Sequence, residues 1–190
     1  KVGPTIADDI KTAAVWAVIF ALLAIGLYIF IRFREFSYAL GATLALVHDA
    51  VITIGSFSLL YSIMPFSMEI DQSFIAAILT VVGYSVNDTV IIFDRIRENV
   101  GLYPKRDRQT VMNDAINSTL SRTFSTSMST LVVLIAIFVL GGETIRGFVF
   151  AMLFGIAIGT YSSVFVASPI TYEIYKRLRK KENAVVEAKK

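Results

Sequence analysis

Residues 10–31 read IKTAAVWAVIFALLAIGLYIFI, and this stretch decides the class of fold. After Lys11 it contains no charged residue. A helix rises about 1.5 Å per residue and the hydrocarbon layer of a bilayer is about 30 Å thick, so about 20 apolar residues are enough to cross it. The stretch therefore predicts a membrane-spanning helix.

Four further stretches of similar length and composition follow it, which predicts an all-α, polytopic transmembrane helix bundle. The five expected spans are residues 10–31, 36–61, 70–93, 120–140 and 148–170. Each is too long for a strand of a membrane barrel, which needs about 10 residues, and none alternates with period 2. The chain is 55% apolar and 17% charged with a mean hydropathy of +0.67, which excludes an ordinary soluble domain.

Composition also narrows the chemistry. The absence of cysteine excludes disulfides and thiolate metal sites, and a single histidine makes a metal centre unexpected, so we predict no metal and no cofactor. No Gly-rich phosphate loop with a Lys-Ser/Thr pair occurs, and we expect neither ATP use nor an enzyme. The net charge of +3 comes from the loops and requires no nucleic-acid partner.

The positions of the basic residues predict the orientation of the spans. One side of the expected bundle holds 14 of the 18 Lys and Arg residues: Arg32, Arg34, Arg95, Arg97, Lys105, Arg106, Arg108, Lys176, Arg177, Arg179, Lys180, Lys181, Lys189 and Lys190. Cytoplasmic loops are rich in Lys and Arg, so we expect the N-terminus outside and the C-terminus in the cytoplasm. Residues 94–119 would form the one sizeable cytoplasmic loop, which carries a short amphipathic helix after Pro104.

Asp49 is the sharpest anomaly in the expected spans. It lies ~20 Å along the helix from Phe36, close to the middle of the membrane, where a charged carboxyl costs at least about 2.5 kcal/mol. His48 is its neighbour but points about 100° away on an ideal helix, so the two need not pair. Asp49 is therefore either a functional membrane charge, with His48 in support, or a hydrogen-bonded residue that ties helices together.

Asp88 is a second acid in an expected span, ~8 Å inside its cytoplasmic end. Thr80 and Tyr84 precede it at intervals of four residues, so their hydroxyls share its face of the helix. Ser85 leaves room for water or another helix, and Asn87 adds a further polar group. A polar patch for helix packing is the alternative interpretation.

Arg122 opens the expected fourth span within a run rich in Ser and Thr. The hydroxyls of Ser125, Thr126 and Ser129 share its face, which predicts a hydrated crevice or a neighbouring helix on that side. The alternative is an arginine that reaches back to the headgroups. Because opposite charges attract in an apolar setting, we expect Asp88 and Arg122 to lie near each other.

Small residues in the expected fifth span predict close helix packing. Gly155 and Gly159 are four residues apart, which forms a ridge that allows another helix to approach closely.

Five motifs together resemble the SecF family of protein-export membrane proteins, in order and spacing, over nearly the whole chain. They are VHD at 47–49, EID at 69–71, GYSVNDT at 83–89, FDRIRE at 93–98 and TLSRT at 119–123. The resemblance implies half of an architecture like that of the RND transporters. It also implies a stub at 1–9 after an external domain, a transmembrane domain at 10–175 and a basic cytoplasmic tail at 176–190.

The resemblance further implies a function in the plasma (inner) membrane of a bacterium or archaeon. With SecD, such a subunit uses the proton-motive force to help draw the translocating polypeptide out of the SecY channel. Its partners would be SecD, the SecY complex, the polypeptide, membrane lipid and protons, and Asp88 and Arg122 would be its functional membrane charges. Two other functions stay open on the residues alone: an RND-type transporter of small molecules or lipids, and a purely structural membrane subunit.

Overall fold

The computed structural model describes the backbone of residues 4–187 and the side chains of residues 12–184. It is 88% helical, and five of its helical stretches are long and apolar enough to cross a membrane, as predicted. The elements are α1 (Pro4–Phe33), α2 (Phe36–Leu60), α3 (Gln72–Leu102), α4 (Arg108–Leu140), α5 (Glu143–Ser162), η1 (Ser163–Ala167) and α6 (Ser168–Glu187). The first three residues of the predicted stub and the last three of the predicted tail lie outside the described residues.

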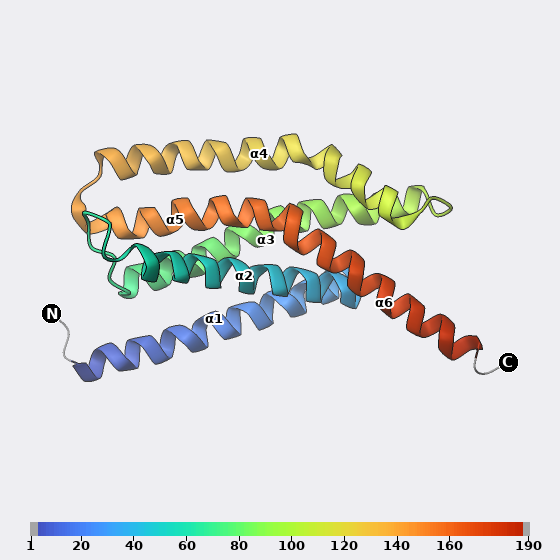
Figure 1. Ribbon diagram of the computed structural model, residues 1–190, viewed down its shortest axis with the longest axis horizontal. Helices are drawn as coiled ribbons and strands as arrows, with labels where there is room; N and C mark the ends of the chain where they lie inside the picture. The colour runs from blue at the N-terminus through green and yellow to red at the C-terminus, as the bar shows by residue number, and fades with distance from the viewer. Residues whose placement is uncertain (1–3, 188–190) are drawn as a thin grey trace.

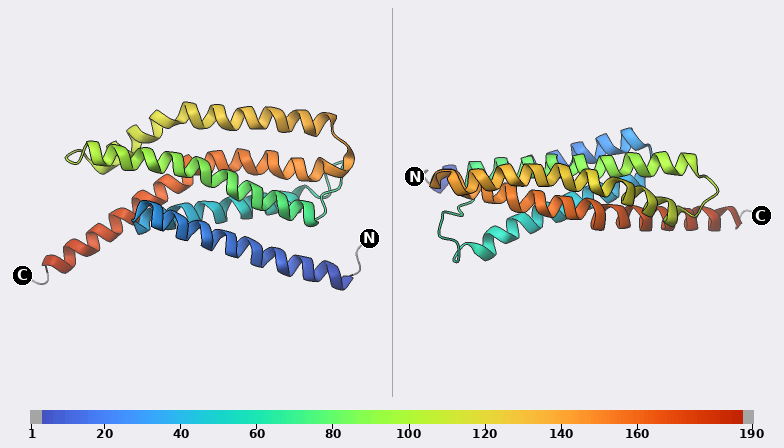
Figure 2. Two further views of the ribbon diagram at one scale, coloured as in Figure 1. Left: turned by 180° about the vertical axis from the view of Figure 1, so that it is seen from behind. Right: turned by 90° about the horizontal axis from the view of Figure 1, so that it is seen from above.

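The helices lie side by side along the long axis of the molecule (Figures 1 and 2). Helix α3 is the central element, because it contacts α1, α2, α4 and α5. The two described ends of the chain lie at opposite ends of the bundle (Figure 1). This is the arrangement expected of an odd number of crossings.

Aromatic side chains fill the core near both ends of the bundle. At one end Tyr38 packs against Phe33 and Phe93, with ring centroids 5.2 Å and 4.9 Å away. At the other end the ring centroids of Phe57 and Phe74 are 4.2 Å apart. Between them, Gly155 and Gly159 of α5 lie directly against Val81 and Ser85 of α3.

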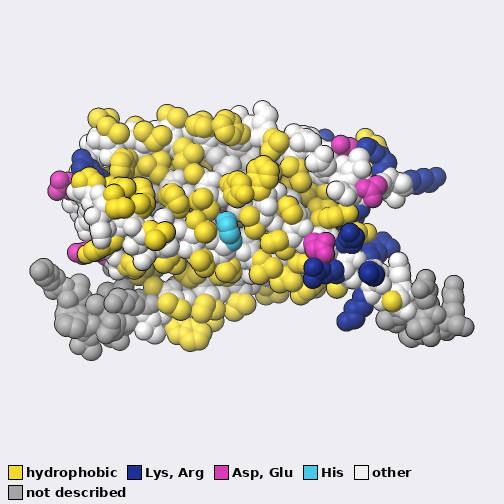
Figure 3. Space-filling model, viewed as in Figure 1, with side chains coloured by type: hydrophobic (Ala, Val, Ile, Leu, Met, Phe, Trp, Pro, Cys, Tyr) yellow, Lys and Arg dark blue, Asp and Glu magenta, His cyan; other side chains and the backbone are white. Residues whose placement is uncertain are grey.

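Charged side chains gather at the ends of the bundle and leave an apolar band between them (Figure 3). At the end near the C-terminus, ion pairs join elements that are distant in the sequence. Arg32 of α1 contacts Asp94 of α3 at 3.0 Å, and Arg108 of α4 contacts Glu35, between α1 and α2, at 3.5 Å. Ion pairs therefore tie the helices together at this end of the apolar band.

The predicted cytoplasmic loop at 94–119 is wrong. Helix α3 continues to Leu102 and α4 begins at Arg108, where Asp107 caps it by accepting a hydrogen bond from the backbone of Thr110. The predicted amphipathic helix exists only as the first turns of α4, where Val111, Met112 and Ala115 are buried. Pro104 therefore interrupts the helical structure for only a few residues, and the helices extend beyond the apolar layer.

The last helical stretch also continues beyond the predicted span. Helix α6 runs to Glu187, past the expected end of the span at residue 170, and residues 176–184 of the predicted basic tail are helical and exposed. Pro169 has no N–H to donate and crowds the preceding turn, and the π-helix η1 comes directly before it. The helix bends at this point in Figure 1, and Ser168 donates to the carbonyl of Ser163 at 3.0 Å across the bend.

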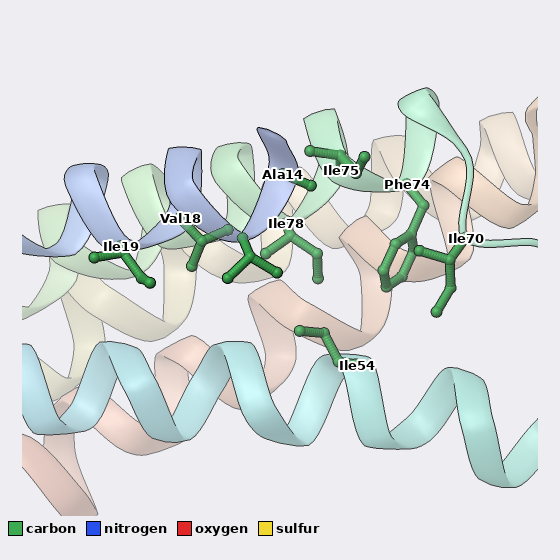
Figure 4. Close-up of a pocket in the computed structure, with 9 residues that line it drawn as sticks. Ala14, Val18, Ile19, Ile54, Ile70, Phe74, Ile75 and Ile78 are labelled. Carbon is green, nitrogen blue, oxygen red and sulfur yellow. The ribbon is translucent and has the colours of Figure 1, made fainter. Parts of the chain in front are cut away.

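Helix α1 leans away from the bundle toward its N-terminal end (Figure 1). Between α1, α2 and α3 it leaves an apolar groove of about 340 Å³, whose lining includes Val18, Ile54 and Phe74 (Figure 4). The groove contains no charged side chain. The residues that line it include neither of the acids predicted within the spans, Asp49 and Asp88.

Candidate functional site

The candidate site is built where α3 and α5 approach most closely. A Cβ atom added at Gly155 would collide with Val81, and one added at Gly159 would lie 2.9 Å from the Cβ of Ser85. Only glycine therefore allows the two backbones to come this close. The contact places two hydroxyl-bearing residues of α5, Thr160 and Ser162, beside α3.

Asp88 of α3 is fully buried, at 0% exposure. Its Oδ2 atom lies 3.2 Å from the hydroxyl of Ser127 on α4 and 3.4 Å from that of Thr160 on α5. Thr160 also lies 2.7 Å from the Ser127 hydroxyl, to which it donates. Since each hydroxyl has one proton, a consistent arrangement is a chain in which Thr160 donates to Ser127 and Ser127 donates to Asp88.

The second carboxyl oxygen of Asp88 is buried and has no hydrogen-bond partner among the described residues. No cation lies within ion-pair distance of it in this part of the chain. A carboxylate in an apolar span costs about 2.5–3.5 kcal/mol, and the two hydroxyls compensate only one of its oxygens. Within this chain, the site is therefore better suited to a neutral carboxyl than to an unpaired charge.

The predicted contact between Asp88 and Arg122 is wrong for this chain. Arg122 lies five residues before Ser127, which places it about 140° around α4 and about 7 Å nearer the start of that helix. Thr123 and Ser127 face the bundle, whereas Arg122 is exposed and forms no ion pair among the described residues. Any cation that balances Asp88 must come from a rearranged bundle or from another chain.

The other predicted polar residues divide between the α3–α4 contact and an exposed strip. Tyr84 bridges the helices, since its hydroxyl lies 3.1 Å from that of Thr130 and 3.3 Å from the Thr126 carbonyl. We call the following exposed residues of α3 and α4 the polar strip: Thr80, Asn87, Arg122, Ser125, Thr126 and Ser129.

Each hydroxyl of the polar strip donates to a backbone carbonyl of its own helix. The side chains of Asn87 and Arg122 make no such hydrogen bond among the described residues. Ser125 donates to Ser121 at 2.7 Å, and Thr126 to Arg122 at 2.9 Å. Satisfied hydroxyls of this kind can face lipid. The polar side chains of Asn87 and Arg122 cannot do so at low cost.

Asp49 of α2 is also at 0% exposure and joins three helices. Its Oδ2 atom accepts hydrogen bonds from Ser85 of α3 at 2.6 Å and from Ser162 of α5 at 2.7 Å. Its Oδ1 atom lies 3.0 Å from Nδ1 of His48. The expectation that these neighbours point apart is wrong, because side-chain rotation brings the imidazole back over the carboxyl.

Sequence reasoning missed Ser127, Thr160 and Ser162, which supply hydroxyls to the two buried carboxyls. Ser127 lay within the Ser/Thr run, but the face of that run was assigned from Arg122. Thr160 and Ser162 flank the glycine ridge, and their proximity to Gly159 was the available signal. Among the described residues, no group of three His, Cys, Asp or Glu side chains is placed to hold a metal.

Comparison with known families and structures gives one consistent result. Residues 1–177 match the family described as protein export membrane protein SecD/SecF, C-terminal. The chain is 54% identical over 176 residues to the protein translocase subunit SecF of Rhodothermus marinus, covering 93% of this chain and 57% of that protein. It is 46% identical to the SecF subunit of Vibrio alginolyticus over 173 residues, covering 91% of this chain and 53% of the relative.

A solved structure has the same fold. The crystal structure of SecDF in a super-membrane-facing form matches with a TM-score of 0.83 and 38% identity, over 96% of this chain and 23% of that one. The chain thus spans little more than half the length of the SecF relatives it matches.

Proposed function

This chain belongs to the SecD/SecF family of protein-export membrane proteins, and we propose that it is the membrane part of a SecF subunit. In this proposal it couples the proton-motive force to completion of polypeptide translocation through the SecY channel, together with SecD. It lies in the plasma membrane of a bacterium or archaeon, with its N-terminal end outside and its C-terminal end in the cytoplasm. Asp88 is the group that binds and releases the proton.

The environment of Asp88 is the observation that supports this role. The carboxyl is fully buried among α3, α4 and α5, one of its oxygens has no partner, and no cation of the described residues reaches it. A neutral carboxyl tolerates this environment. An ionised one requires a new donor, water or a cation, so the two protonation states favour different arrangements of the surrounding helices.

Proton binding and release would then move helices. Ionisation favours an opening that admits water or brings a positive charge toward Oδ1, whereas protonation favours the closed packing seen here. Because Ser127 of α4 donates to the carboxyl and Thr160 of α5 donates to Ser127, the change acts on both contacts of α3. Repeated exchange with the two sides of the membrane would rock α3 against its neighbours and carry the motion to the outer ends of the helices.

The polar strip supports a partner in the membrane. Arg122 and Asn87 are exposed at membrane depth, and a neighbouring protein with an acidic group would lower the cost of that exposure. The resemblance to SecDF favours SecD as this neighbour. Because Arg122 lies on α4, whose Ser127 contacts Asp88, pairing with that acid would also couple the partner to the helices around Asp88.

A purely structural subunit is the second candidate, because the hydroxyls of the polar strip already bond to their own helices. The substitution Asp88→Asn separates the two, since it keeps the shape of the side chain and removes its titration. We expect the full-length variant to express and to co-purify with SecD-type and SecY-type subunits. In membrane vesicles, it should lose the part of export that depends on an imposed proton gradient and keep the ATP-driven part.

Asp94→Asn is the matched control, because Asp94 is an exposed carboxylate one turn and a half further along the same helix. It should export like the wild type. Full gradient-dependent export by Asp88→Asn would contradict the proposed function and favour the structural role.

A further inference from the structure

The second buried carboxyl, Asp49 of α2, is held by hydroxyls of α3 and α5, and the proton step at Asp88 by itself gives it no role. Ser85 and Ser162 both donate to its Oδ2 atom, at 2.6 and 2.7 Å. Oδ1 is left to His48, whose Nδ1 lies 3.0 Å away. One carboxyl oxygen therefore accepts hydrogen bonds from two hydroxyls, and the other contacts the imidazole ring of His48.

His48 connects this buried carboxyl to the surface of the bundle. The side chain of Asp49 is at 0% exposure, whereas that of His48 is at 34%. Histidine lies within the apolar band in Figure 3, and His48 is the chain's one histidine. The imidazole thus links the buried carboxyl to the lateral face of the bundle.

The contact between His48 and Asp49 is suited to holding one proton. With one proton the pair is either an imidazole beside a carboxylic acid or an imidazolium beside a carboxylate, and both forms have no net charge. Loss of that proton leaves one negative charge, and gain of another leaves one positive charge. Charge in an apolar span is costly, so each change alters how firmly Asp49 holds the hydroxyls of α3 and α5.

Those hydroxyls belong to the same two helices that hold Asp88. On α3, Ser85 contacts Asp49 and lies three residues before Asp88. On α5, Ser162 contacts Asp49 while Thr160, two residues earlier, contacts Asp88. A shift of α5 along α3 therefore changes the hydrogen bonds of both carboxyls together.

Two further features would help a shift of α5 along α3 to pass from Asp49 to Asp88. Gly159 lies directly against Ser85, so only the small serine side chain separates the two backbones there. The π-helix Ser163–Ala167 begins immediately after Ser162, and π-helical turns are weak points of helices that often occur at functional sites.

We propose that His48 and Asp49 form a second protonation site of the membrane domain, whose proton sets the register of α3 and α5 at Asp88. Asp49 is then a positioning residue for the proton step, and the inference rests on the proposed role of Asp88.

Few other titratable groups face this pair. The one on α3 is Asp88, because the Tyr84 hydroxyl turns to Thr130 of α4, and on α5 the nearest is Tyr161, which is exposed. Residues 12–31 of α1 and the π-helix carry no charged residue. A change in the charge of the pair is therefore felt chiefly by Asp88.

The test is a pH titration of carboxyl bands by difference infrared spectroscopy, on the full-length protein in complex with its partner in lipid. Asp88→Asn and Asp49→Asn assign the two buried bands. We expect Asp49→Asn to remove one band and to shift the midpoint of the Asp88 band by about tenfold in proton concentration, a typical coupling between linked sites. His48→Phe should keep the Asp49 band and shift its midpoint.

Asp94→Asn is the control, and it should remove an exposed carboxylate without moving the Asp88 midpoint. If Asp49→Asn does not fold, Ser162→Ala serves instead, since it removes one donor and should shift both midpoints. An Asp88 midpoint that is unchanged in Asp49→Asn, or in Ser162→Ala, would overturn the proposal and leave the cluster as a structural tie. The titration needs no export, so a failure of the proposed function at Asp88 would appear in the vesicle assay and not here.

Discussion

At the scale of single residues, Asp88 and Asp49 are both fully buried but differ in how their oxygens are satisfied. Asp49 has partners on both oxygens, from Ser85, Ser162 and His48. Asp88 has partners on one oxygen only. The hydrogen bonds of the Asp49 carboxyl are therefore complete. Those of the Asp88 carboxyl are not, so Asp88 gains more from a change of surroundings.

Arg122 provides the first prediction at this scale. In the full-length protein with its SecD partner, Arg122→Met should abolish gradient-dependent export, because it keeps much of the side-chain length and removes the charge. Arg122→Lys should restore part of the activity, since the charge returns without the planar guanidinium. Export by membrane vesicles with and without a proton gradient measures both.

Arg106→Met is the control, because Arg106 lies in the α3–α4 connection and pairs with Asp114 at the surface. Surface pairs contribute about 0–1 kcal/mol, so export should stay near the wild-type level. If Arg122→Met were as active as this control, Arg122 would only be an arginine reaching for the headgroups.

Residue-level chemistry could be predicted only in part. The cost of charge in an apolar span was enough to single out Asp49, Asp88 and Arg122. Which groups meet across helices depends on helix rotation, and a polar face assigned from Arg122 did not include Ser127, which contacts Asp88. The contact of His48 with Asp49 depends on side-chain rotamers, which spacing along the helix does not specify.

At the scale of helices, the α3–α5 contact determines the site. Gly159 lies against Ser85, so Gly159→Leu should force the helices apart and lower stability by about 1–3 kcal/mol through overpacking. Thermal unfolding of the purified protein in detergent, measured against the wild type, tests this.

Gly55→Leu is the matched control within α2, because a Cβ atom at Gly55 meets nothing within 4 Å. It should leave the unfolding midpoint nearly unchanged. Equal stability of Gly159→Leu and Gly55→Leu would mean that the close contact of α3 and α5 does not exist in the membrane.

The presence of the five spanning helices could be predicted from the sequence, but the residues at which the helices end could not. Apolar length identified all five spans, since only such stretches can cross the hydrocarbon layer. The same signal stops where the apolar layer stops, so it placed the end of the third span at residue 93 although α3 continues to Leu102. Beyond the membrane, caps such as Asp107 and contacts such as Arg95 with Ser118 decide where a helix ends.

At the scale of the whole molecule, the distribution of charge predicts which end faces the cytoplasm. Single cysteines can be introduced into this cysteine-free chain without interference. Cysteines at Ser67 and Thr144, both exposed, should react with an impermeant reagent added outside the cell. Cysteines at Gln109 and Asn183, exposed at the opposite end, should react only after the membrane is opened. Outside labelling of Gln109 would reverse the orientation.

If protons cross the membrane by way of Asp88, the proton flux should depend on its carboxyl. The full-length protein and its SecD partner would be reconstituted with the SecY channel in vesicles containing a pH-sensitive dye, and a proton gradient would be imposed during export. We expect export-dependent proton movement in the wild type and in Asp94→Asn, and its loss in Asp88→Asn. Equal proton movement in Asp88→Asn and the wild type would contradict the proposed role of Asp88.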